Sequence, residues 1–144
     1  MAFAPGQFIT AQRLNRLQPK TYWAQASGTF PVSQTTQDIP GTSMSIVVET
    51  TGATIACDWS VSVYATGSAA TSSSARAWFG SDSSPVFALS QSTGATGEKA
   101  SVANSWLTTV PAAGTYTAKL VGTTQSNTTM SNYSSLKVVV TEVA

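Results

Sequence analysis

Apolar and polar residues alternate with a period of two along most of the chain after residue 20. The clearest segment is 53–64, where one parity is apolar throughout: Ala53, Ile55, Cys57, Trp59, Val61 and Val63. Successive side chains of a strand point to opposite faces, so this pattern indicates a strand with one buried and one solvated face. Because Cys57 lies in the middle of the apolar parity, we expect it to be a small buried hydrophobe rather than a reactive thiol.

Seven further segments have the composition or the alternation of strands. They are residues 21–30, 44–50, 75–80, 85–90, 100–110, 115–122 and 133–143. Small polar residues separate them, and we expect loops at 66–75, 91–100 and 123–132. About eight strands at such intervals predict an all-β fold, an antiparallel β-sandwich of the jelly-roll type.

The first 20 residues do not follow this pattern. Thr10 is a good N-cap, because its hydroxyl can accept a hydrogen bond from the first helical turn, and Pro19 ends a helix that runs to about Gln18. The sequence therefore predicts two parts: an N-terminal arm with a short helix over 1–20, and a β-sandwich domain over 21–144.

The predicted helix has an apolar stripe that needs a partner. Ile9 and Leu14 hold the positions of a hydrophobic staple, and Leu17 lies three residues after Leu14 on the same side. A helix this short is marginal alone in water, so we expect the stripe to dock either on its own β domain or on a neighbouring subunit. In the second case Arg13, Arg16 and Lys20 would be rim charges that face an acidic neighbour.

The surface chemistry excludes several classes of protein. Charged residues make up 9% of the 144 residues, well below the roughly 25% that is typical, and the net charge is +1. A nucleic-acid binder needs a dense field of Lys and Arg, so we expect no nucleic-acid partner. No run approaches 18 apolar residues and the first residues lack a secretory pattern, so we expect no membrane-spanning helix and no signal peptide.

Catalytic and metal-binding groups are scarce. The chain has no histidine and one cysteine, which excludes Ser-His and Cys-His pairs, imidazole ligands and thiolate clusters. Asp58 with Glu49 is the candidate for a glycosidase-type acid pair, on the assumption that their strands are neighbours. We favour solvated or turn-capping roles for these acids, and we predict no enzyme activity, no catalytic residues, no cofactor and no metal.

Two tryptophans are candidates for external contacts, whereas Trp59 and Trp106 lie on core parities. Trp78 precedes Phe79, so one of the two must point away from the core, and Trp23 directly follows the arm. An outward indole could stack on a sugar or be buried by a partner chain, and we favour the partner chain because interfaces are rich in aromatic residues.

Both ends of the sequence resemble known proteins. The opening, "PGQFITAQRLNRLQPKTYWAQASGT", resembles the start of small structural proteins of actinobacterial phages and prophages, in which "G-x-x-I-T-A-x-x-L-N" precedes a β domain. The segments "AAGTYTAKLVGTT" and "SSLKVVVTEV" are similar to the last two strands of jelly-roll modules of the C1q and tumour-necrosis-factor type, which occur in phage fibres.

The resemblance implies a virion component that is made in a bacterial host cytoplasm. It implies a minor tail or tail-fibre subunit, commonly a homotrimer, that contacts other virion proteins through its arm. The matching anchor positions are Ile9, Thr10, Ala11, Leu14 and Asn15.

The strand match implies that Tyr116, Ala118 and Leu120 face the core or the trimer axis. Tyr116 thus joins Trp78 and Trp23 as a candidate for a subunit interface or a glycan contact. The chain lacks a shaft or collagen-like repeat, which keeps capsid decoration open. The other alternative is a carbohydrate-binding module that engages the host cell wall through Trp78.

Overall fold

The computed structural model describes residues 10–29, 35–67, 71–84, 88–92, 96–124 and 127–143. In these ranges one helix precedes eleven strands. They are α1 (Ala11–Leu17), β1 (Lys20–Gln25), β2 (Gln37–Asp38), β3 (Met44–Val48), β4 (Thr54–Ala65), β5 (Thr71–Phe79), β6 (Asp82–Ser83), β7 (Ala88–Ser92), β8 (Lys99–Thr109), β9 (Gly114–Thr124), β10 (Thr128–Met130) and β11 (Ser135–Thr141).

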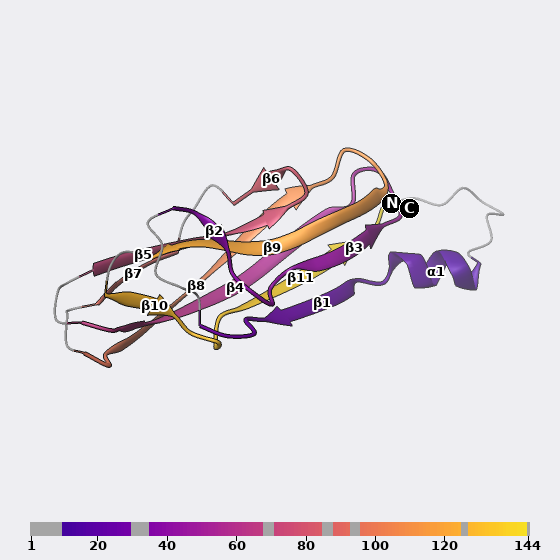
Figure 1. The fold of residues 1–144 in the computed structure, drawn as a ribbon. Coiled ribbons are helices and arrows are strands. Elements are labelled where there is room, and N and C mark those ends of the chain that lie inside the picture. The colour runs from indigo at the N-terminus through magenta and orange to yellow at the C-terminus, as the bar shows by residue number, and fades with distance from the viewer. Residues whose placement is uncertain are drawn as a thin grey trace.

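The strands form two antiparallel sheets that pack face to face, and α1 projects beyond one end of the sandwich (Figure 1). In sheet A, β1 pairs with β11, and β11 pairs with β4. One side of β4 pairs with β11 along Thr54–Ser60 and with the short β10 along Val63–Ala65. The other side of β4 pairs with β8. In sheet B, β2 and β3 pair with one side of β9, β5 pairs with the other side, and β6 and β7 pair with β5. The predicted all-β sandwich with a short N-terminal helix is confirmed.

The core lies between the sheets and is built from the predicted inward parities. On β4 and the residue before it, the whole apolar parity is at most 3% exposed: Ala53, Ile55, Cys57, Trp59, Val61 and Val63. Leu136, Val138 and Val140 of β11 lie beside them, and Ala118 and Leu120 of β9 face them from sheet B.

Cys57 lies inside this core. Its burial, together with the neighbouring Asp58 carboxylate, raises the pKa of the thiol to about 12. The thiol is therefore protonated at neutral pH, which confirms that Cys57 acts as a small hydrophobe.

All three predicted loops are shorter than expected because strands extend into these Ser/Thr-rich spacers. β5 begins at Thr71 inside the predicted 66–75 loop, β7 runs to Ser92, and β10 occupies Thr128–Met130 inside the predicted 123–132 loop. Thr is β-branched and fits a pleated strand, so a polar composition alone does not indicate a loop. Within 85–90, residues 85–87 lie outside the described part of the chain, and the backbone from 88 onward pairs with β5.

Two glycines are required by close packing. Gly80 turns β5 into β6 with φ +63, and a Cβ atom there would come within 2.8 Å of the Tyr116 ring. Gly122 of β9 leaves room for Met130 of β10, whose Cε atom would lie 2.6 Å from a Cβ at position 122. Met130 is fully buried, so this contact ties the short β10 to sheet B.

Candidate functional site

The helix of the arm begins and ends as its sequence predicts. Thr10 has extended backbone angles and its hydroxyl accepts a hydrogen bond from the Arg13 N–H at 3.2 Å, so it is the N-cap. At the other end the N–H of Gln18 donates to the Asn15 carbonyl, and the backbone is extended before Pro19.

The helix buries none of its own residues. Leu14 is 51% exposed and Leu17 is half-buried. Ile9 lies outside the described residues, so its staple contact with Leu14 stays a prediction. Since α1 has only seven residues, its own hydrogen bonds give it little stability in water.

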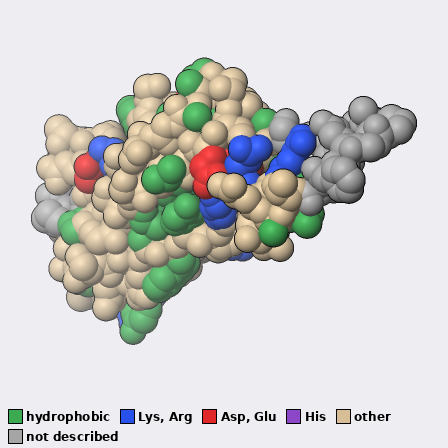
Figure 2. All heavy atoms as spheres, turned by 90° about the vertical axis from the view of Figure 1, so that its right-hand side faces the viewer, with side chains coloured by type: hydrophobic (Ala, Val, Ile, Leu, Met, Phe, Trp, Pro, Cys, Tyr) green, Lys and Arg blue, Asp and Glu red, His purple; other side chains and the backbone are tan. Residues whose placement is uncertain are grey.

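The side of α1 that meets the sandwich is polar. Thr10, Gln12, Arg13 and Arg16 line a cleft together with Glu49, which follows β3. Figure 2 shows this end of the molecule, where basic side chains gather beside acidic ones next to the base of the arm. The described part of the arm therefore faces its own domain through charge, and Leu14, the most exposed large apolar side chain of α1, is 51% exposed.

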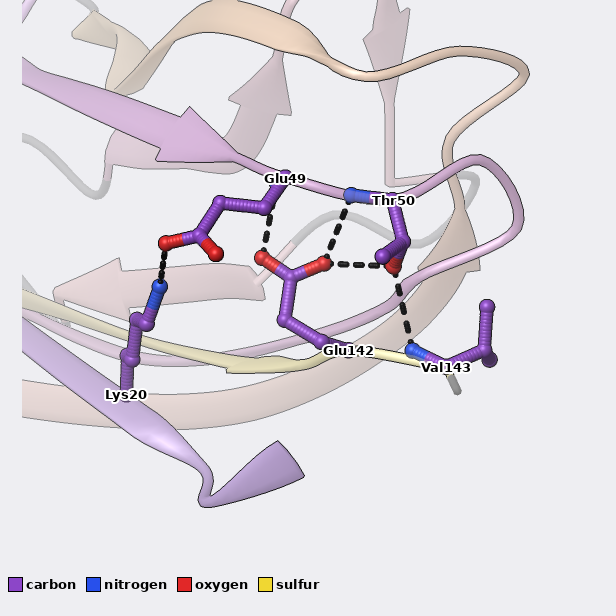
Figure 3. Close-up of polar contacts among 5 residues, drawn as sticks. All are labelled: Lys20, Glu49, Thr50, Glu142 and Val143. Carbon is purple, nitrogen blue, oxygen red and sulfur yellow. Dashed lines mark hydrogen bonds and ion pairs between the residues drawn. The ribbon is translucent and has the colours of Figure 1, made fainter. Parts of the chain in front are cut away.

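A buried carboxylate stabilises the end of the sandwich beside the arm (Figure 3). Glu142 is 4% exposed, and one oxygen accepts from the Glu49 N–H at 2.8 Å. The other accepts from the Thr50 N–H at 2.9 Å and the Thr50 hydroxyl at 2.6 Å, and that hydroxyl accepts from the Val143 N–H.

The Glu142 carboxylate and the nearby Lys20 ammonium group both have shifted pKa values that favour their charged forms. Burial acts to raise the pKa of Glu142, but the hydrogen bonds from Thr50 and Glu49 and the charge of Lys20 together hold it below the ordinary value. Lys20, the first residue of β1, forms an ion pair and hydrogen bond with Glu49, which raises the pKa of its ammonium group. The Glu142 carboxylate and the Lys20 ammonium group are thus both charged at neutral pH. The ion pair of Lys20 with Glu49 joins β1 to the end of β3. The expectation that Lys20 is a rim charge for a neighbouring subunit is therefore wrong, because its partner lies in the same chain.

The predicted acid pair is wrong in its geometry. Asp58 lies on β4 in sheet A, whereas Glu49 follows β3, which pairs with β9 in sheet B, so their strands are not neighbours. Each acid has its own basic partner: Asp58 lies 3.7 Å from Lys137, and Glu49 pairs with Lys20. Among the described residues, no three His, Cys, Asp or Glu side chains are grouped as a metal site would require.

Trp78 points outward and its neighbour Phe79 is buried. This agrees with the expectation that one of these two adjacent side chains points away from the core. Its indole is partly covered by its own subunit, since Arg76 Cζ lies 5.3 Å and Lys119 Nζ 6.0 Å from the ring centre. Lys119 is held in turn by Asp38, at 2.8 Å. These cation–π contacts cover part of the ring surface on which a ligand would stack.

Tyr116 is half-buried and belongs to the packing of its own subunit. Its ring stacks on Phe79 with centroids 5.2 Å apart, and its hydroxyl donates to the Ala112 carbonyl at 2.7 Å. Trp23 differs from both candidates, because its side chain is 61% exposed on the outer face of β1.

No helix in the described ranges has the length and apolar character needed to cross a membrane. No protein-family model matches the sequence. No curated protein matches it either.

The fold is similar to that of chains in solved structures of infectious bursal disease virus. One match is to a chain of the T13 viral particle of this icosahedral virus, with a TM-score of 0.58 and 13% identity over 84% of this chain. Another is to a chain of the Gt strain, with a TM-score of 0.53 and 14% identity over 96% of this chain. The matched regions make up 31% and 37% of those viral chains, so this chain spans about a third of their length. At such identities the likeness shows the fold alone: the chain is an antiparallel jelly-roll β-sandwich whose fold is similar to part of these viral chains.

Proposed function

We propose that this chain is a non-enzymatic structural subunit of a bacteriophage particle, a trimeric minor tail or fibre-type protein attached through its N-terminal arm. The arm anchors the subunit on another virion protein, with Leu14 and Leu17 as the apolar contact and Arg13 and Arg16 at its rim. The phage assignment rests on the resemblance of the opening residues, and a viral particle is supported by the similarity of the fold to chains of a viral particle.

The observation that carries the anchoring role is the exposure of α1. A two-turn helix that leaves Leu14 51% exposed gains little from its own domain, because it meets that domain through a polar cleft. Burial of Leu14 on a neighbouring protein would supply the missing apolar contact, on the order of 1–2 kcal/mol for the exposed half of the side chain.

The decisive test compares two equally exposed apolar residues. Leu14→Ser should abolish incorporation into purified particles, whereas Val47→Ser, at a position 54% exposed on β3, should leave it unchanged. Deletion of residues 1–18 should have the same effect as Leu14→Ser and still leave β1 and the Lys20–Glu49 pair in place. Normal incorporation of the Leu14 variant, measured by quantitative mass spectrometry of particles, would contradict the anchor.

Capsid decoration is the second candidate, and the similarity to chains of an icosahedral particle favours it. Cryo-electron microscopy of particles separates the two, because density for the chain lies on the tail in one case and on the capsid shell in the other. Trimer formation is tested by light scattering on purified protein and on the particle-bound form, and a monomer in both would contradict it.

A further inference from the structure

The outer face of sheet A carries a shallow depression that the proposed attachment through the arm does not use. Its lining combines one exposed indole with charged and hydroxyl side chains: Trp23, Asp58, Ser60, Ser105, Ser135 and Lys137. All of them come from strands of a single sheet, so the depression is held by paired backbone rather than by loops. We call it the Trp23 groove.

Four of these residues form a straight row across the sheet. Trp23 lies opposite Lys137 on β11, Lys137 opposite Asp58 on β4, and Asp58 opposite Ser105 on β8. Residues that are opposite in paired strands point to the same face, so the four side chains stand side by side. At the usual spacing of neighbouring strands the row spans roughly 14 Å.

The floor of the groove is low because the middle of the next row has small side chains, and the larger Gln25, opposite Ser135, ends that row on β1. Ser135 lies opposite Ser60, and Ser60 lies opposite Ala103. The two serine hydroxyls are 3.1 Å apart and share a hydrogen bond. Trp23, which is 61% exposed, therefore stands above this floor at one end of the groove.

The middle of the groove is ionic and open to water. Lys137 Nζ and Asp58 Oδ2 are 3.7 Å apart, and their side chains are 49% and 53% exposed. A pair this loose keeps donors on the ammonium and acceptors on the carboxylate for a ligand. The centres of protein interfaces are depleted in charged residues, so a docked protein is a poor fit to this groove.

We propose that the Trp23 groove binds a short neutral saccharide. A pyranose ring has an apolar C–H face that can stack on the Trp23 indole, and its rim of hydroxyls can donate to Asp58 and accept from Lys137. The opposite charges of these two residues cancel, so the groove has no preference for a charged sugar. Hydroxyls of Ser60, Ser105 and Ser135 extend the polar contacts along the floor.

This assignment moves the glycan contact from Trp78 to Trp23. Arg76 and Lys119 approach the Trp78 ring, and its indole nitrogen is itself buried, so a sugar would have to displace side chains of the same subunit. Trp23 carries no such cover among the described residues, and the floor beside it is already open.

The test uses the full chain labelled with nitrogen-15 and titrated with cellotetraose, maltotetraose, chitotetraose and mannotetraose. We expect saturable shifts of the Trp23 indole N–H and of the Asp58 and Lys137 amides with at least one of these probes. Trp23→Ala should weaken that binding by at least about tenfold, and Trp23→Phe should weaken it less because a smaller ring still stacks. Trp78→Ala is the matched control and should change the affinity by no more than about twofold.

Three outcomes overturn the proposal. One is the absence of saturable shifts with every probe, and another is an equal loss of binding in the Trp23 and Trp78 variants. The third is that the parent protein is an oligomer that binds no sugar and that Trp23→Ala dissociates this oligomer. The outer face of sheet A would then be a contact between copies of the chain. Incorporation of Trp23→Ala into particles is measured separately and should be normal, so this test and that of the arm can fail independently.

Discussion

The β-sandwich and the N-terminal arm are stabilised in opposite ways. In the sandwich, the inward side chains of β4 and β11 are almost completely buried, and each strand has paired neighbours. In the arm, α1 buries no residue and meets the sandwich across a polar cleft. Most of the free energy of folding is therefore gained by the sandwich. The exposed apolar surface of α1 remains available for contact with another protein.

Removal of a leucine from the core should have the largest effect on stability, and removal of one from the arm the smallest. Leu136 is fully buried between the sheets, so Leu136→Ala should lower the free energy of unfolding by about 2–5 kcal/mol through lost contacts and a cavity. Urea denaturation followed by tryptophan fluorescence measures this loss. A loss below about 1 kcal/mol would mean that the core is not where the structure has it.

The turn between β5 and β6 provides the next largest effect. Gly80→Ala combines a positive φ with an overlap on Tyr116, and should cost about 2–4 kcal/mol. Gly52→Ala is the matched control, because Gly52 has φ +79 but no atom within 4 Å of the added methyl group, and should cost only about 1–2 kcal/mol. Equal thermal shifts for the two variants would show that the Tyr116 ring moves aside freely.

The buried carboxylate should contribute a smaller, pH-dependent amount. Glu142→Gln places an amide NH2 against backbone or hydroxyl donors, which should cost about 1–3 kcal/mol at neutral pH. The folded-state pKa of Glu142 is lowered, so its stabilisation is present above the ordinary value of 4.5 and is lost as the pH falls through the lower folded-state value.

Urea midpoints at neutral pH and at a pH well below 4.5 measure this contribution. The difference between the parent protein and Glu142→Gln should shrink at the lower pH. Asp38→Asn, which removes an exposed partner of Lys119, is the control and should change stability little at either pH. An unchanged Glu142→Gln difference at low pH would contradict the ionised carboxylate.

Truncation of the exposed leucine of the arm should change stability least. Leu14→Ala should change the free energy of unfolding of the isolated chain by no more than about 1 kcal/mol, because only half of the side chain is covered by its own chain. The same urea experiment that detects Leu136→Ala measures it. A loss near that of Leu136→Ala would mean that the arm packs on its own sandwich in solution.

Residue parity predicted the faces of the strands but not their neighbours. The period-two pattern placed Trp59 and Leu136 in the core, because burial on one face depends only on local alternation. The pairing of Asp58 and Glu49 failed because strand order is set by long-range contacts that no local pattern encodes. The Trp23 groove depends on the same information, since its row joins four strands from distant parts of the chain.

The burial of Glu142 could have been recognised from its position in the sequence. It follows Leu136, Val138 and Val140 on the same parity, so an acid stands where an inward apolar residue was due. A buried acid requires donors, and the N–H groups of Glu49 and Thr50 supply them. The pattern can identify such a residue as unusual, but only the fold identifies its partners.

The pairing of β1 has a consequence for the order of events during synthesis of the chain. β1, which carries the arm, forms its ladder with β11, and the paired residues lie more than a hundred positions apart. A ribosome must therefore synthesise the segment Ser135–Thr141 before the strand next to the arm can enter its sheet. Chains truncated before that segment would leave β1 without its partner strand. The arm would therefore be held in its folded position only in chains whose synthesis has passed β11.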